Sequence, residues 1–340
     1  MLTLLLARYG VESLACFDAK PGTLKSGQAD GLQPRTLEVL KSLDLVDEIL
    51  NHGCHMSEVA FWNPKTGGNS GIERTSFVPD VVVAARYKHE VTIHQGRIER
   101  IIEENIQRYS RNVIHRSTKF IDFQLDAAND AEYPLVIELE KTSGDGSTQS
   151  STVRAKYLVG ADGAHSKVRN SMGQELKGET TDHIWGVVDF VADTNFPDVR
   201  KRCAIHSDVG SVMIIPRERI SSGDYLTRLY VQIVDEVPAD TNGDDKEARL
   251  RANKRRAAIT LQYIMDQARR AFSPYTIDIK AGTEVDWWAA YQIGQRMASK
   301  FTLKDQDDLE RVFIVGDGKP LSFGNSLSDT ANLIRSLPYT

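Results

Sequence analysis

Apolar residues along this chain repeat with two spacings, one typical of helices and one typical of strands. Helical spacing is found over residues 2–9, 36–50 and 95–109. Strands are predicted at 13–18, within 112–158, and at 184–192, 202–206, 211–216, 226–234 and 311–315. A charged helix is predicted over about 244–270. The order of these elements predicts an α/β fold with a β-rich insert, after which the chain returns to the α/β core.

Turn residues divide the segments between these elements. Residues 19–33 are predicted to form a polar loop, because they contain two glycine turns. Strand patterns alternate with Asn63-Pro64 and Gly67-Gly68 over residues 57–93, which predicts a β-ribbon. Residues 143–151 are predicted to form the flexible tip of a hairpin, and the chain has no internal repeat.

The composition excludes several classes of protein. The chain has 340 residues, enough for two lobes, and its net charge of -5 argues against a nucleic-acid surface. The arginine-rich stretch 249–256 is interpreted as a solvated helix face. We expect no membrane span, because no apolar run reaches about 18 residues, and the short apolar start lacks the basic region of a signal peptide. Three scattered cysteines predict a reducing, cytoplasmic location and no disulfide or metal site.

Two segments near the start carry candidate chemistry. Asp18 ends a strand where an open α/β fold places the acid that binds a ribose. The alternative is a strand-end acid in solvent, because the chain begins too close to Asp18 for the glycine-rich turn that should precede it. In the loop 27–38, Thr36 is positioned to cap a helix and Arg35 to face a phosphate, and a simple capped turn is the alternative.

Two glycine motifs make the sequence specific. The stretch 157–169, with Gly160-Ala-Asp162-Gly163 and Arg169, resembles the internal Asp-Gly fingerprint of flavin-dependent aromatic hydroxylases. Val312-Phe-Ile-Val-Gly316-Asp317 is similar to the ribityl site of that family. Similar segments run through about residues 10–317, so the chain resembles the p-hydroxybenzoate hydroxylase type, and above all phenol 2-monooxygenase and its fungal relatives.

The resemblance implies a fold and its boundaries. It implies a Rossmann-like FAD-binding lobe over 1–178, with the ribbon 57–93, and an inserted β-sheet substrate lobe over 179–296. Residues 297–340 then return to the FAD lobe. The family opens with a strand and a Gly-x-Gly-x-x-Gly turn, so the chain is expected to start within the following helix. It is also expected to lack the C-terminal helices and thioredoxin-like domain of phenol hydroxylase.

The resemblance also implies a reaction, in which NADPH reduces FAD, O₂ is activated, and one oxygen atom is transferred to a phenol ring. Asp30 matches the acid that assists deprotonation of the phenol, Tyr230 the tyrosine that contacts its hydroxyl, and Arg217 a nearby arginine. The residues assigned to cofactor binding are Asp18, Gln28, Arg35, Gln95, Asp162, Arg169, Arg228, Gly316, Asp317 and Asn325. Asp162 is expected to serve both FAD and NADPH, and homodimers are common in the family.

Alternatives to this assignment stay open. Asp30 and Arg217 also fit a purely structural ion pair, and Tyr230 also fits a core tyrosine whose hydroxyl is satisfied. The segment after Asp317 is shorter than in the family, which leaves the backbone around the flavin open to question. Two other functions therefore compete with hydroxylation: a flavin-free homologue that binds a small molecule or a protein, and a flavin enzyme with reductase or oxidase activity only.

Overall fold

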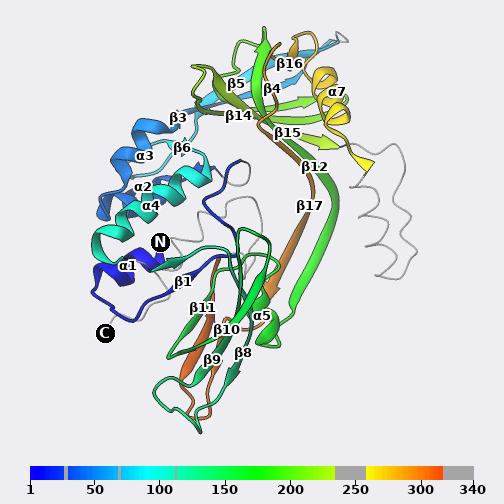
Figure 1. Ribbon diagram of the computed structural model, residues 1–340. Coiled ribbons are helices and arrows are strands. Elements are labelled where there is room, and N and C mark those ends of the chain that lie inside the picture. Colours follow the sequence, from blue (N-terminus) through cyan, green and yellow to red (C-terminus); the bar gives the residue numbers. More distant parts are fainter. Residues whose placement is uncertain (27–29, 68–69, 112, 234–257, 317–340) are drawn as a thin grey trace, which may run out of the picture. The chain divides into compact units, whose positions relative to one another are not determined.

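The computed structural model describes residues 1–26, 30–67, 70–111, 113–233 and 258–316. The chain divides into two compact units (Figure 1). Unit 1 comprises Met1–Lys25, Gly96–Glu179 and Gln295–Thr340, and unit 2 comprises Ser26–Gln95 and Thr180–Gly294. None of the described helices is both long and apolar enough to cross a membrane.

Unit 1 combines helices with short parallel strand pairs. Its elements are α1 (Leu2–Arg8), β1 (Cys16–Phe17), α4 (Gln95–Tyr109), β7 (Ile114–His115), β8 (Thr118–Leu125), β9 (Leu135–Thr142), β10 (Thr148–Ala155), β11 (Leu158–Gly160), α5 (Lys167–Ser171), β18 (Thr302–Lys304) and β19 (Glu310–Ile314). β1 pairs with β7, and β11 pairs with β19, both in parallel. Parallel pairing beside helices is the arrangement expected of an α/β lobe, so the predicted fold class is confirmed.

Unit 2 is built on a large sheet. Its elements are β2 (Gly31–Leu32), α2 (Pro34–Ser42), α3 (Val46–His52), β3 (Cys54–Met56), β4 (Glu58–Pro64), β5 (Ile72–Pro79), β6 (Glu90–Thr92), β13 (Arg202–Ser207), β14 (Gly210–Arg219), β15 (Tyr225–Ile233), α7 (Leu261–Ala271) and β16 (Ile277–Ile279). Two long strands, β12 (Leu176–Thr194) and β17 (Trp287–Ala298), contribute to both units. The order of the sheet is β16-β12-β15-β14-β13-β4-β5, and β17 also pairs with β12.

The structure corrects several predicted elements. The helix expected over 36–50 is two helices, α2 and α3, because Asp44 adopts a left-handed backbone with φ of 60° and interrupts the helical hydrogen bonds. The strand expected at 13–18 covers only Cys16–Phe17. The hairpin tip expected at 143–151 is shorter, because β10 already begins at Thr148. The charged helix expected over 244–270 lies partly outside the described residues, and α7 covers its end.

The predicted lobe boundaries differ from the two units at one place. The predicted FAD lobe 1–178 includes residues 26–95 with the ribbon 57–93, whereas Ser26–Gln95 groups with unit 2. The physical reason is strand pairing. β4 runs parallel to β13 and carries its hairpin partner β5 into the large sheet. The assignment of the lobes to cofactor and substrate stays a proposal.

Candidate active site

The centre of the large sheet in unit 2 has one apolar face and one charged face. Side chains alternate between the faces of a strand. Val188 on β12 and Leu229 on β15 belong to the apolar core with Ile264 of α7, and α7 contacts β14 and β15 (Figure 1). Asp189 follows Val188 and Arg228 precedes Leu229, and these two charged residues are paired directly across the strands. They therefore lie on the face opposite α7.

Four buried charged side chains meet on this charged face. Arg217 Nη1 lies 3.1 Å from Asp30 Oδ2 and 3.1 Å from Asp189 Oδ2. Arg228 donates two hydrogen bonds of 2.6 Å to the two carboxylate oxygens of Asp189. Its Nη1 also lies 3.3 Å from Asp30 Oδ1. Because both guanidinium groups are 1% exposed, these contacts are little screened by solvent.

A bulge in β14 helps to position Arg217. The pairing of β14 with β15 shifts between Pro216 and Arg219, so two residues of β14 face one residue of β15. Glu218, within the bulge, accepts hydrogen bonds of 3.0 and 3.2 Å from Arg217 Nε and Nη2. Arg200 donates a 2.7 Å hydrogen bond to the Arg217 carbonyl oxygen. Hydrogen bonds therefore hold the bulge through both the side chain and the carbonyl oxygen of Arg217.

Asp30 reaches the cluster from a separate small sheet. It precedes β2, which pairs with β6, and its carbonyl accepts a 2.9 Å hydrogen bond from the Ile93 N–H. Thr92 of β6 in turn donates a 2.7 Å hydrogen bond to the Pro216 carbonyl of β14. This chain of contacts brings an acid from residue 30 to arginines almost 200 positions later.

Tyr230 lies two residues after Arg228 on the same face of β15. Its hydroxyl accepts a 3.4 Å hydrogen bond from Arg228 Nη1. The guanidinium carbon of Arg228 also lies 5.5 Å from the ring centroid of Trp287 on β17. Tyr230 is half-buried, so its hydroxyl belongs to the edge of the cluster. The structure thus brings together all three residues predicted to be catalytic.

Burial changes the acid–base properties of this site. It raises the pKa of the Asp30 carboxyl above its usual range, an effect that Arg217 and Arg228 oppose and that Asp189 and Glu218 reinforce. Burial, together with the charge of Asp30, also raises the pKa of Tyr230. Asp30 is therefore more readily protonated in this site than an exposed aspartate is.

The sequence analysis missed Asp189 and Glu218. Asp189 is fully buried within the apolar run Val187-Val188-Asp189-Phe190-Val191. A charge in the middle of such a run must find a partner, because an isolated buried charge is very costly. That pattern was the signal for Asp189. Arg228 uses its guanidinium group within this cluster, and its expected contact with the cofactor stays a prediction.

In unit 1, Asp18 lies just after β1, next to the end of β7. Its Oδ1 accepts a 2.9 Å hydrogen bond from the Lys20 N–H, and its Oδ2 lies 2.5 Å from Arg116 Nη1. Arg116 also pairs with Glu103 of α4. The side chain of Asp18 is 37% exposed, which leaves room for a ligand at the carboxylate. Arg116, the partner of Asp18, is a third residue that the sequence analysis missed.

The Asp-Gly motif shapes a helix start in unit 1. Asp162 accepts hydrogen bonds from Ser166 Oγ (2.5 Å) and from the N–H groups of Lys167 (2.6 Å) and Val168 (3.1 Å). A Cβ on Gly160 would lie 2.6 Å from Val168 Cβ, so only glycine permits this approach of α5 to β11. Asp162 thus stabilises the first turn of α5, and its predicted contact with cofactor stays a prediction.

The other predicted cofactor residues are scattered over both units. Arg169 is buried within α5 of unit 1, and Gly316, with φ of 63°, follows β19. Arg35 of unit 2 is 72% exposed and pairs with Glu38, while Gln95 begins α4. Gln28, Asp317 and Asn325 lie outside the described residues. Among the described residues no cluster of histidine, cysteine or acids could hold a metal ion.

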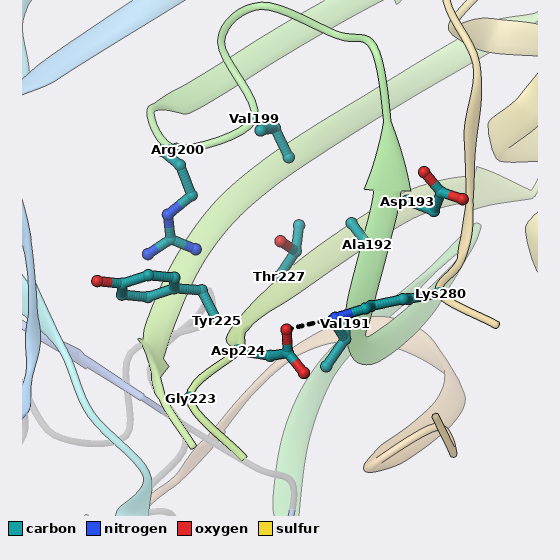
Figure 2. A pocket seen from close by; sticks show the side chains of 10 residues that line it. All are labelled: Val191, Ala192, Asp193, Val199, Arg200, Gly223, Asp224, Tyr225, Thr227 and Lys280. Atoms are coloured by element: carbon teal, nitrogen blue, oxygen red, sulfur yellow. Dashed lines mark hydrogen bonds and ion pairs between the residues drawn. The ribbon is translucent and has the colours of Figure 1, made fainter. Parts of the chain in front are cut away.

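A cavity of about 460 Å³ opens on unit 2, away from the charged cluster around Asp30 (Figure 2). Figure 2 shows Arg200 beside Tyr225 at one side and the Lys280–Asp224 ion pair of 2.6 Å at the other. Thr227 also lines the cavity. Because Thr227 is adjacent to Arg228 in β15, it points to the opposite face of the strand. The cavity is lined by none of the three predicted catalytic residues, so we do not assign it to the phenol.

Known proteins resemble this chain over most of its length. The chain is 38% identical over 321 residues to the flavin-dependent oxygenase ucdD of Aspergillus ustus, covering 93% of this chain and 48% of that protein. It is 34% identical over 303 residues to the phenol 2-monooxygenase fsqG of Aspergillus fumigatus, covering 88% of this chain and 45% of that protein. The chain thus spans about half the length of these curated relatives.

The fold agrees with these matches. The crystal structure of p-nitrophenol 4-monooxygenase PnpA from Pseudomonas putida DLL-E4 superposes with a TM-score of 0.66 at 18% identity, covering 96% of this chain and 71% of that one. The family described as FAD binding domain matches residues 1–319. The chain therefore belongs to the FAD binding domain family, and its relatives include a phenol 2-monooxygenase.

Proposed function

We propose that this protein acts in the FAD-dependent hydroxylation of a phenolic aromatic compound, with NADPH as the reductant and O₂ as the oxidant. The observation that carries the proposal is the buried pairing of Asp30 with Arg217 and Arg228, with the Tyr230 hydroxyl at its edge. A purely structural ion pair needs no phenolic hydroxyl beside it. The match to a phenol 2-monooxygenase supports the choice of substrate class.

The residues of unit 1 fit the adenosine end of FAD. Asp18 follows a strand that runs parallel to its neighbour, and its carboxylate is partly open to solvent. This is the position from which a carboxylate binds the hydroxyls of a ribose in open α/β folds. Arg116 and Glu103 hold the Asp18 carboxylate in this position. When bound, FAD would supply the redox and oxygen-transfer chemistry.

In the proposed mechanism, Asp30 takes the proton of the phenol. A phenolate ring is the better nucleophile toward an oxygen donor, so removing this proton accelerates the reaction. The raised pKa of Asp30 suits this role, because a carboxyl with an ordinary pKa is a weak base toward a phenol. Arg217 and Arg228 stabilise the negative charge as it moves between Asp30 and the phenol oxygen.

Tyr230 is proposed to orient the substrate. Its hydroxyl oxygen accepts from Arg228, which leaves the O–H free to point toward a phenol oxygen. The raised pKa of Tyr230 keeps that proton in place at neutral pH. The proposal also includes a cytoplasmic protein and a homodimer. The location rests on the scattered cysteines and the dimer on the family resemblance, and size-exclusion chromatography with light scattering would test the dimer.

The first experiment is the visible absorption spectrum of the purified chain before and after addition of FAD. A bound-flavin spectrum, followed by NADPH-dependent conversion of a phenol to a catechol, is the expected result. NADPH consumption that yields only hydrogen peroxide would replace hydroxylation with an oxidase activity. A protein that stays colourless but binds phenol in calorimetry would identify a flavin-free binding module and overturn the proposal.

A further inference from the structure

Together with Glu218, the buried cluster contains three carboxyl groups but only two guanidinium groups. Arg228 is committed to Asp189 through two hydrogen bonds of 2.6 Å, one to each oxygen. Arg217 is similarly committed to Glu218 through bonds of 3.0 and 3.2 Å. Two-pronged pairs of this kind are the strongest contacts an arginine makes with a carboxylate. Each guanidinium charge is therefore matched by an acid other than Asp30.

Asp30 receives the weaker contacts of the cluster. Its two oxygens lie 3.1 Å from Arg217 and 3.3 Å from Arg228, with one nitrogen from each arginine. Its Oδ2 is buried, and the nearby Arg217 nitrogen is not aligned for a hydrogen bond. With Asp189 and Glu218 ionised, the two arginines are already neutralised. Asp30 is then the acid whose charge is left over.

Asp189 is placed to control which acids the two arginines bind. It lies in the middle of β12, directly across from Arg228 in the strand register, and is fully buried. Its Oδ2 also accepts a 3.1 Å hydrogen bond from Arg217, so it is the acid that hydrogen-bonds both arginines. Accordingly, we infer that Asp189 is a positioning residue that holds both guanidinium groups and thereby leaves Asp30 as the carboxyl that exchanges a proton. The inference rests on the proposed function in one point only, which is the use of that proton exchange in hydroxylation.

The groups that act on Asp30 are Arg217 and Glu218 from β14, Arg228 from β15 and Asp189 from β12, and Tyr230 and Tyr291 respond to its charge. Asp286, next to His94, also interacts with Asp189, Arg217 and Glu218. Removing the charge of Asp189 leaves two guanidinium groups with one committed acid. Arg228 Nη1 still lies 3.3 Å from Asp30 Oδ1, and Asp30 should bind it as a carboxylate. The proton on Asp30 should consequently be lost at lower pH.

The test is the infrared titration of the protonated carboxyl band in the purified chain without cofactor. The parent protein should show this band and Asp30→Asn should not, which would assign the band to Asp30. In Asp189→Asn the band should titrate at lower pH by about one unit or more, a tenfold change in the protonation equilibrium. Asp193→Asn is the matched control, because Asp193 lies on the same strand and is exposed. It should leave the titration unchanged.

A double variant keeps the inference testable if Asp189→Asn fails to fold. Asp189→Asn combined with Arg228→Gln removes one charge of each sign, so the titration of Asp30 should return toward that of the parent. An unchanged or raised titration in Asp189→Asn would overturn the inference. So would a parent band that survives in Asp30→Asn, because the leftover proton would then belong to another acid.

These measurements need neither bound FAD nor turnover. A chain that shows the expected titrations but no hydroxylation would retain the role of Asp189 and lose the proposed function. A chain that hydroxylates phenol but shows no shift in Asp189→Asn would retain the function and lose the inference. The two failures are therefore distinguishable.

Discussion

Asp30 in unit 2 and Asp162 in unit 1 differ in what surrounds their carboxylates. Asp162 is exposed and accepts its hydrogen bonds from residues four to six positions later in the chain. Asp30 is 7% exposed and lies between arginines of two strands almost 200 residues away. One acid is satisfied by the adjacent helix start, and the other depends on distant parts of unit 2.

This difference indicates which kind of work each acid can do. Backbone N–H groups hold a carboxylate in one orientation, which suits the capping of a helix. Competing arginines and acids in a buried site leave a carboxyl whose protonation responds to small changes. Acids with shifted pKa values are the ones found at catalytic sites. The comparison therefore supports the proposed chemistry at Asp30 and shows that Asp162 stabilises local structure.

The largest expected effect comes from Asp30→Asn. In the FAD-loaded protein it should lower the rate of phenol hydroxylation by about 10²–10⁴-fold, because an amide cannot accept the phenol proton. Steady-state assays of product formation would measure the change. Substrates supplied at a pH where the phenol is already ionised should recover part of the rate. An unchanged rate at neutral pH would remove the distinction between the two acids.

Arg217→Met should cause the largest loss of stability. It leaves Asp30 and Glu218 buried with one fewer cation, and breaking a buried ion pair typically costs about 3–5 kcal/mol. Urea unfolding would measure the free energy of unfolding. Arg35→Met is the matched control, because Arg35 is 72% exposed and its ion pair is solvated. That variant should change stability by less than about 0.5 kcal/mol. Equal losses in the two variants would contradict the burial argument.

The stability of the protein should also depend on pH through Asp30. Its pKa is raised in the folded state, so the folded protein binds this proton more tightly than the unfolded chain does. Stability contributed by the proton is present below the unfolded pKa of about 3.9 and is lost as pH rises through the folded pKa. Urea unfolding across a pH series should show this decline in the parent and not in Asp30→Asn. Identical pH profiles would show that Asp30 has no raised pKa.

The same contrast explains what the sequence could predict. The Asp-Gly turn, the helix over 95–109 and the strands near 202–206 and 211–216 depend on local patterns, and they are found where expected. The break at Asp44 was missed, because the flanking leucines keep a helical spacing across it. Asp30, Arg217 and Tyr230 were identified only through the family resemblance. Their meeting depends on strand pairing over long sequence separations, which no local pattern records.

Gly186→Ala tests the apolar face that backs the charged one. A Cβ at this position would lie 2.6 Å from Ile264 Cγ1, and Ile264 is fully buried. The expected loss is about 1–3 kcal/mol of unfolding free energy, because α7 must shift away from β12. Gly144→Ala is the control, since a Cβ there meets no atom within 4 Å. Thermal melting would compare the two variants, and a neutral Gly186→Ala would show that α7 is loosely packed.

The smallest expected effect is that of Asp162→Ala, which completes the comparison with Asp30. The variant removes the acceptor for Ser166 and for two backbone N–H groups at the start of α5. Loss of such a cap typically costs about 1 kcal/mol. Asp162→Asn should lose less, because its amide oxygen still accepts. If urea unfolding shows this order while FAD binding is unchanged, Asp162 is a structural cap. If FAD binding falls in both variants without a matching loss of stability, the acid contacts the cofactor directly, and the two aspartates are more alike than their surroundings indicate.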